Sequence, residues 1–292
     1  MKVFLTGGSG FIGRNLIEYF QGRHTVLAPT HNELDLLDEL AVTAFMKQNP
    51  VDILIHSAVK PGHRNAKDFS GILTSNTQMF FNLIKNEDSF GKMIYLGTGL
   101  CYDLRAYVPK MTEEYFGQHI PADEAGHAKY VCANECLKNS KTTDLRIFGV
   151  FGKYEDYAIR FISNAICKSL LNMPITLRQN RNFDYIFIDD LTRIIEFFMQ
   201  NEVEYRSYNI TPDKSVSLLE IAHLVCEITG NQNLPIVSQE GMGTEYSGDN
   251  SRLRNLIPAY EFTPLRNAIT DLTDYYKTVI HTFDKAIFAH DK

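Results

Sequence analysis

The sequence contains no uninterrupted apolar run of about 18 residues, the length that would indicate a transmembrane helix. The first 13 residues also lack the successive charged, apolar and small-residue regions of a secretory signal peptide. We therefore expect a cytoplasmic protein that has no membrane partner.

An excess of positive charge is also missing. Lys and Arg number 29 against 35 Asp and Glu, which gives a net charge of −6. Proteins that bind nucleic acid need clustered positive charge to neutralise phosphates, so we expect no nucleic-acid partner. Because 44% of the 292 residues are hydrophobic, the chain can bury a large core, as one big domain or two unequal ones.

Cysteine is sparse and has no metal-binding spacing. The five cysteines are scattered, their number is odd, and no Cys-x-x-Cys occurs, which indicates reduced thiols and not a disulfide framework. Cys132 and Cys136 are spaced to share a helix face, but two ligands do not make a zinc site. We predict no metal centre and interpret these cysteines as packing residues.

Short apolar runs alternate with amphipathic segments through the first half of the chain. Strands are expected at residues 2–6, 24–28, 51–56, 92–97 and 144–148, with helices between them. This alternation predicts an α/β fold, a Rossmann-type doubly wound parallel sheet. After about residue 150 the pattern is shorter and less regular. We predict a main domain over residues 1–150 and, over 151–292, mainly a smaller C-terminal lobe, with some segments returning to the main sheet.

A glycine-rich segment, Thr6-Gly7-Gly8-Ser9-Gly10-Phe11-Ile12-Gly13, joins the first expected strand to the first helix. Gly7 allows a sharp turn, Gly10 lets the backbone approach a pyrophosphate, and Gly13 lets the helix pack closely on the strand. The helix N-terminus then offers free N–H groups to the anion. The sequence therefore predicts that residues 1–150 bind a dinucleotide.

The segment after the second strand bears on the choice of cofactor. An acidic residue at this place would bind the ribose 2′-hydroxyl of NAD and repel a 2′-phosphate. Here residues 28–32 read Ala-Pro-Thr-His-Asn, and the first carboxylate is Glu33. Thr30, His31 and Arg14 are suited to a 2′-phosphate, so we favour NADP(H). In the alternative they are ordinary loop residues and NAD(H) binds.

Several motifs together resemble the extended short-chain dehydrogenases/reductases, the NAD-dependent epimerase/dehydratase family. In the first half, residues 6–13 resemble the family's glycine signature, residues 34–36 its adenine-contacting segment, and residues 56–58 its adenosine-ribose segment. Asn76 with Thr77 and Asn82 resembles the family's central-helix asparagine pattern. Later in the chain, residues 146–152 resemble the family stretch R-x-x-N-V-Y-G, residues 183–190 resemble R-D-F-I-Y-V-D-D, and residues 246–254 resemble the segment near a bound sugar nucleotide. Two departures stand out: Gly149 replaces the usual Asn, and Phe183 replaces the usual Arg.

The resemblance implies an enzyme of nucleotide-diphosphate sugars, with a substrate-binding role for residues 151–292. It is closest to bacterial deoxysugar reductases such as GDP-fucose synthase and CDP-abequose synthase, on the strength of residues 33–38 and 146–152. We expect an NAD(P)-dependent 4-keto-6-deoxysugar reductase. The alternatives are a 4-epimerase or dehydratase and a non-catalytic NAD(P)-binding homologue. The family resemblance also suggests a homodimer.

The resemblance and the glycine loop together assign site residues. The expected cofactor contacts are Gly7, Gly10, Phe11, Ile12, Gly13, Arg14, Thr30, Asp35, Leu36, Ser57, Ala58, Asn76 and Lys129. The expected substrate contacts are Thr98, Arg146 and Arg252, since guanidinium groups bind phosphate oxygens bidentately. Alternatively, Arg146 holds a structural carboxylate and Arg252 is a surface residue. His56 is interpreted as a packed residue at a strand end.

Family members use a Tyr as proton donor or acceptor, a Lys four residues later, and a Ser or Thr that holds the same sugar oxygen. The Tyr-x-x-x-Lys spacing puts both side chains on one helix face. Thr98 and Lys129 match two of these positions, but Ala125 occupies the position of the Tyr. No tyrosine in the chain is followed by a lysine four residues later.

Three explanations of Ala125 remain open. It is an engineered Tyr→Ala change made to trap a substrate, or a natural variant that uses another acid, or a mark of a natural non-catalytic homologue. Glu124, His127, Tyr130 and a bound water are the candidate acids, although His127 lies on a different helix face from position 125. We expect hydride transfer to be slow or absent while both ligands still bind.

Overall fold

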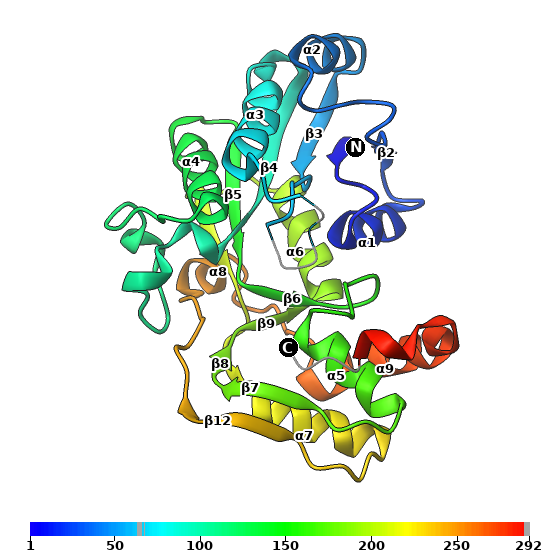
Figure 1. The fold of residues 1–292 in the computed structure, drawn as a ribbon. Helices are drawn as coiled ribbons and strands as arrows, with labels where there is room; N and C mark the ends of the chain where they lie inside the picture. The colour runs from blue at the N-terminus through cyan, green and yellow to red at the C-terminus, as the bar shows by residue number, and fades with distance from the viewer. Residues whose placement is uncertain (63–65, 67, 289–292) are drawn as a thin grey trace.

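The structure, a computed structural model, describes residues 1–62, 66 and 68–288 of the chain (Figure 1). Its strands are β1 (Lys2–Thr6), β2 (Thr25–Leu27), β3 (Val51–His56), β4 (Phe90–Thr98), β5 (Thr142–Ile147), β6 (Gly149–Phe151), β7 (Thr176–Asn180), β8 (Asn182–Phe183), β9 (Tyr185–Phe187), β10 (Ser207–Ile210), β11 (Val216–Ser217) and β12 (Ile236–Met242). Its α-helices are α1 (Phe11–Phe20), α2 (Glu39–Gln48), α3 (Ile72–Ile84), α4 (Glu124–Lys138), α5 (Phe161–Leu170), α6 (Ile188–Gln200), α7 (Leu218–Thr229), α8 (Ser251–Leu256) and α9 (Leu265–Val279).

A six-stranded parallel sheet forms the centre of the fold. Its strand order is β10-β5-β4-β3-β1-β2, and every neighbouring pair is parallel. The chain moves outward from β1 to β2 and then crosses back to β3 on the other side of β1, so the connections change direction between β1 and β3. Ligands of doubly wound folds bind at such a switch point, at the carboxyl ends of the strands.

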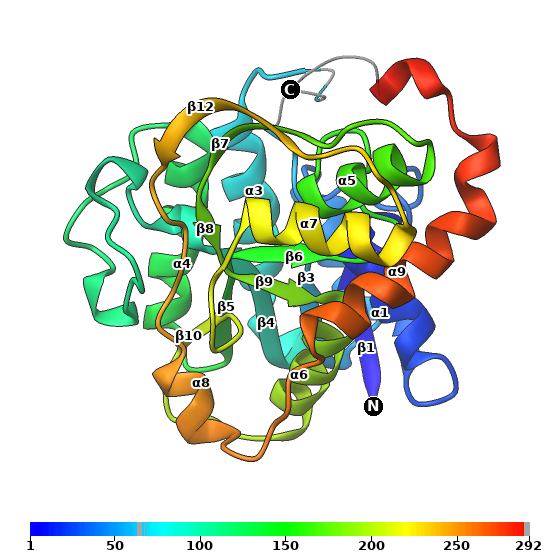
Figure 2. The same ribbon diagram turned by 90° about the horizontal axis from the view of Figure 1, so that it is seen from below.

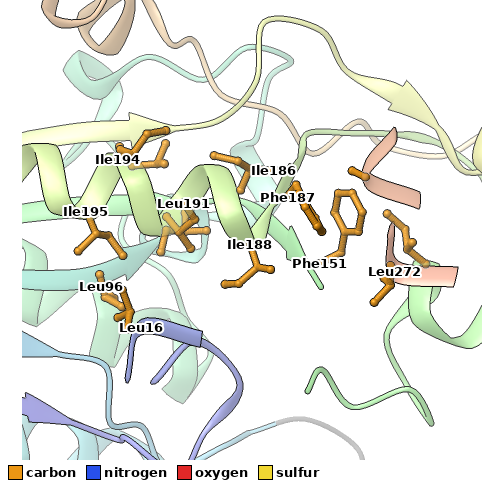
Figure 3. Close-up of a cluster of buried hydrophobic side chains, with 14 of the residues drawn as sticks. Leu16, Leu96, Phe151, Ile186, Phe187, Ile188, Leu191, Ile194, Ile195 and Leu272 are labelled. Atoms are coloured by element: carbon orange, nitrogen blue, oxygen red, sulfur yellow. The ribbon is translucent and has the colours of Figure 1, made fainter. Parts of the chain in front are cut away.

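Helices cover both faces of this sheet, which explains why the residues of its central strands are mostly buried. Successive residues of β1 alternate between the two faces: Val3 and Leu5 belong to one core and Phe4 to the other. The first core packs under α1 and α6, where Figure 3 shows Leu16 beside Leu96. The second core packs under α2, α3 and α4.

The second half of the chain builds a smaller lobe at the carboxyl ends of the strands. It contains α5, α7 and α9 and three short strand pairs, β6–β9, β7–β12 and β8–β11 (Figures 1 and 2). The lobe packs on the sheet domain through the same core, since Phe151, Ile186 and Leu272 join the α6 residues (Figure 3). Helix α7 begins with a capping box of Ser217 and Glu220 and ends at Gly230, whose φ is +75°.

The prediction of a Rossmann-type α/β fold with a smaller C-terminal region is confirmed. All five strands expected in the first half are present, with ends shifted by at most two residues. Strand β10, from beyond residue 150, pairs with β5 and completes the sheet. Across the described residues, none of the helices has the length and hydropathy that crossing a bilayer requires.

Candidate active site

Two cavities lie along the carboxyl edge of the sheet. The first, of about 450 Å³, lies between the ends of β1 and β3 and is lined by the glycine loop and residues 34–37. The second, of about 710 Å³, extends from the glycine loop past the end of β4 into the lobe. Gly10, Ser57 and Val59 line both, so the two form one trough that we call the active-site trough.

The glycine loop has the backbone geometry that its sequence predicts. Gly7 has a φ of +72°, which favours glycine, and a Cβ at Gly13 would collide with the Gly7 carbonyl oxygen. Helix α1 has no side-chain cap at Gly10 and no acidic residue in its first turn. Its first N–H groups are therefore without a capping side chain and suit an anion that lies against the loop.

The ends of β1 and β3 are locked together by Thr6. Its hydroxyl accepts hydrogen bonds from the backbone N–H groups of Ser57 and Ala58, at 3.2 Å each, and bonds to His56 Nδ1 at 2.8 Å. Burial lowers the pKa of His56 to about 3, so its imidazole is neutral. These contacts agree with the interpretation of His56 as a packed residue, and they fix the floor of the trough.

The predicted cofactor residues divide into two groups. Asp35, Leu36, Ser57 and Ala58 line the first cavity together with Gly7 and Gly10, and Phe11 and Ile12 line the second. Gly13, Arg14, Thr30 and Asn76 are not among the lining residues. The Arg14 guanidinium lies 3.8 Å from the centre of the Tyr154 ring, Thr30 donates to the Glu33 carboxylate, and the Asn76 amide holds the backbone of Lys60.

The trough fits a nicotinamide dinucleotide. Its middle is the glycine loop, its floor is held by Thr6, and one end is a slot beside Leu34, Leu36 and Met79. The opposite end holds Lys129. These surfaces can bind, in turn, a nucleotide base, a diphosphate and the two hydroxyl groups of a ribose.

Thr98 and Lys129 both line the second cavity. Thr98 ends β4, where its hydroxyl accepts a hydrogen bond from the N–H of Leu100 at 3.3 Å. Lys129 Nζ donates to the carbonyl oxygen of Leu96 at 3.2 Å and lies 4.9 Å from the centre of the Tyr95 ring. Burial lowers the pKa of this ammonium group.

Position 125 provides no acid and does not line the trough. A Cβ at Gly62 would lie 3.5 Å from the Ala125 methyl group, which places Ala125 against the chain that follows β3. The candidate acids on α4 also lie outside the trough. Glu124 accepts from the N–H of Leu73, the Tyr130 ring stacks on Phe116, and His127 meets the edge of Tyr130.

The two arginines expected at the substrate do not line the trough. Arg146 is fully buried in β5, where its Nε donates to Asp144 Oδ2 at 2.8 Å and its Nη1 donates to Tyr102 Oη at 2.8 Å. Arg252 donates to Glu114 Oε1 at 2.5 Å. Both guanidinium groups are paired with carboxylates. For Arg146 this is the alternative that the sequence analysis left open, and a substrate role for either arginine stays a prediction.

The sequence analysis did not identify the residues that the lobe contributes. Among the described residues that line the second cavity, the cations are Lys129, Arg160, Lys168, Arg178 and Arg181, and Glu155 is the one carboxyl group. Burial raises the pKa of Glu155 to about 8, and Ser163 donates to it at 2.6 Å. Two phenols, Tyr185 and Tyr246, line the same cavity. Tyr185 and Tyr246 fall within segments 183–190 and 246–254, which resemble family motifs. No short motif marks Glu155 or the cations of the lobe, because several different elements bring them together.

Comparison with known proteins gives a consistent result. Residues 3–211 match the model of the NAD dependent epimerase/dehydratase family. A GDP-L-colitose synthase of Yersinia pseudotuberculosis is 30% identical over 107 residues, 35% of each chain. A GDP-6-deoxy-D-talose 4-dehydrogenase of Aggregatibacter actinomycetemcomitans is 22% identical over 93% of this chain and 97% of its own. MlghC, a GDP-mannoheptose C4 reductase of Campylobacter jejuni with NADP bound, superimposes with a TM-score of 0.80 at 22% identity, covering 94% of this chain and 98% of its own.

Proposed function

Since the chain belongs to the NAD-dependent epimerase/dehydratase family, we propose that it is an NADPH-dependent reductase of a GDP-linked 4-keto-6-deoxy sugar. The observation that carries the proposal is the continuous trough, which joins the glycine loop to Thr98 and then to a cationic lobe. Residues 1–150 would hold the cofactor, and residues 151–292 would hold most of the sugar nucleotide.

The preference for a GDP sugar rests on the relatives. The similar proteins described above are named for GDP-linked sugars, and two of them for reactions at sugar C4. The lobe offers chemistry that suits a nucleotide diphosphate, because Arg160, Arg178 and Arg181 face the trough and guanidinium groups pair with phosphate oxygens.

The preference for NADP(H) rests on charge at the end of β2. No carboxylate lies between Ala28 and Asn32, and His31 lines the first cavity. A carboxylate at this place would repel a 2′-phosphate. Thr30 contributes nothing to this preference, because its N–H and hydroxyl groups both donate to the Glu33 carboxylate. MlghC was solved with NADP bound, which supports the choice.

Each part of the trough has a role in the proposed reaction. The loop N–H groups and the N-terminus of α1 would bind the cofactor diphosphate, and Lys129 its ribose. The reduced nicotinamide, when bound, supplies a hydride. Thr98 would hold the carbonyl oxygen of the sugar, and the lobe arginines its diphosphate. Reduction also requires a proton for that oxygen, and Ala125 cannot supply it, so turnover through the usual position would be impaired.

Binding and turnover measurements test the proposal. We expect calorimetry to show affinity for NADPH, at least about tenfold weaker affinity for NADH, and affinity for GDP. Reduction of a GDP-4-keto-6-deoxyhexose would then consume NADPH in equal amount. Folded protein that binds neither coenzyme would overturn the proposal. Interconversion of two GDP-hexoses without net NADPH consumption would identify an epimerase.

A further inference from the structure

We infer that Tyr246 is the acid of this site and donates its phenolic proton to the sugar oxygen that Thr98 holds. The inference rests on the proposed function, because it concerns the proton that carbonyl reduction requires. It assigns a catalytic role to a residue of the lobe, far along the chain from the helix that carries Ala125.

The Tyr246 hydroxyl lies where the missing phenol is needed. Its oxygen is 3.5 Å from Thr98 Oγ1, and both residues line the second cavity. A Cβ at Gly99 would lie 2.7 Å from the same hydroxyl oxygen. The hydroxyl therefore lies directly over the end of β4, in space that glycine at position 99 leaves open. A carbonyl oxygen in the cavity beside both hydroxyls could accept a hydrogen bond from each.

The ring of Tyr246 is held in place by other aromatic rings. The centres of Phe148, Tyr107 and Phe183 lie 5.2, 5.4 and 5.7 Å from its own. The backbone is fixed as well, since the Tyr246 N–H donates to the Asn182 carbonyl oxygen and its own carbonyl oxygen accepts from the N–H of Asp184. The bond to Thr98 is thus not needed to position the phenol, which is preorganised for a substrate.

The departures from the family pattern cluster around this phenol. Phe183, which replaces the usual Arg, packs its ring against Tyr246. Gly149, which replaces the usual Asn, lines the same cavity, and a Cβ there would lie 2.6 Å from the carbonyl oxygen of Asp184. Both changes put an apolar residue at a position of this cavity where the family has a polar one, while the phenol of Tyr246 lines the same cavity.

The other two acids that line the cavity are placed differently. Glu155 accepts a hydrogen bond from Ser163 of α5, and the Tyr185 ring stacks on Phe183. Thr98 is bonded to neither of them in the structure. Burial raises the pKa of Tyr246 above its ordinary value. The phenol is therefore protonated before the reaction, and it gives up its proton only as negative charge develops on the sugar oxygen.

The proposed step balances in atoms and electrons. The carbonyl carbon gains a hydride from the reduced nicotinamide, and the electron pair of the C=O π bond moves to the oxygen. That oxygen takes the proton of Tyr246, so one C–H and one O–H bond form. The sugar is reduced, the coenzyme is oxidised, and the tyrosinate regains a proton from solvent in the trough.

The test compares Tyr246→Phe with Tyr107→Phe. Tyr107 is a matched control, because its ring stacks on Tyr246 while its hydroxyl donates to the Ser247 carbonyl oxygen and does not line the trough. We expect Tyr246→Phe to slow single-turnover reduction of a GDP-4-keto-6-deoxyhexose by about 10²-fold or more, with GDP and NADPH affinities changed by less than about threefold. Tyr107→Phe should stay within about threefold of wild type.

A second measurement does not depend on turnover. In protein labelled with ¹³Cζ-tyrosine, the resonance lost in Tyr246→Phe should shift when NADP⁺ and a GDP-hexose bind together. Turnover in Tyr246→Phe equal to wild type, or an unmoved resonance with both ligands bound, would overturn the inference. A wild-type protein that binds both ligands but reduces nothing would also overturn it, whereas one that binds neither would reject the proposed function itself.

Discussion

At the scale of single residues, the sequence predicts side chains that belong to contiguous motifs. Thr98 and Lys129 lie together in the trough because the end of β4 and the face of α4 are both set by local patterns. Tyr246 lies 148 residues from Thr98. The resemblance of residues 246–254 to a substrate segment indicates the neighbourhood of Tyr246, but no local pattern indicates its contact with Thr98. Arg146 lies beside Asp144 on the same strand, and the ion pair between them agrees with the structural alternative that the sequence analysis left open.

Glu155 leads to a prediction about stability and pH. Its pKa is raised from 4.5 to about 8 in the folded protein, mainly by burial. Between about pH 4.5 and 8 the folded state therefore keeps a proton that the unfolded state loses. The free energy of unfolding falls as pH rises through this range, because deprotonation favours the unfolded state. Glu155→Gln cannot ionise, so it should gain stability relative to wild type over this range.

Urea unfolding at pH 5 and pH 8 measures the effect. We expect the difference in unfolding free energy between Glu155→Gln and wild type to grow by about 2–4 kcal/mol between these pH values, since one pKa unit corresponds to about 1.4 kcal/mol. A difference that stays constant with pH would show that the carboxyl group titrates normally.

At the scale of elements, prediction succeeds where one face of a helix or strand is apolar and glycine marks the turn. Strands β1 and β3 begin and end at the expected residues, because the apolar runs that form them are local. The short strands of the lobe, such as β8 and β11, have two residues each. Their pairing depends on tertiary contacts that a periodic pattern does not encode.

Gly13 provides a test at this scale. A Cβ there would collide with the Gly7 carbonyl oxygen, so Gly13→Ala must push the start of α1 away from the turn. We expect NADPH affinity to fall by about 10²-fold, because the N–H groups of the loop lose their alignment on the diphosphate. Calorimetry of the folded variant measures this loss.

Gly22→Ala is the matched control. Gly22 follows α1 with a φ of +76° and has nothing within 4 Å of a Cβ. Alanine at position 22 adds backbone strain without a collision, at a cost of about 1 kcal/mol in stability. Its NADPH affinity should equal that of wild type, and a similar loss in both variants would contradict the role given to Gly13.

At the scale of the whole molecule, the two halves of the trough are expected to bind different ligands. Arg181 lines only the lobe side. We expect Arg181→Ala to weaken GDP binding about tenfold or more, since a charge-assisted contact to phosphate is lost. NADPH affinity should not change, and calorimetry with each ligand separates the two effects.

Arg193→Ala serves as the control for a change of charge alone. Arg193 is exposed on α6 and does not line the trough, so both affinities should remain those of wild type. Equal losses of GDP affinity in Arg181→Ala and Arg193→Ala would show that overall charge, and not a local contact, governs binding.

The position of strand β10 determines what happens when the chain is truncated. It covers the outer edge of β5, whose residues are buried on both faces and include the Arg146–Asp144 pair. A fragment that stopped at residue 150 would expose a row of unpaired backbone groups next to that buried charge pair, and bare edges of this kind recruit other chains. Residues 1–150 are thus not expected to fold as a detachable unit, because residues 207–210, synthesised much later, complete the sheet.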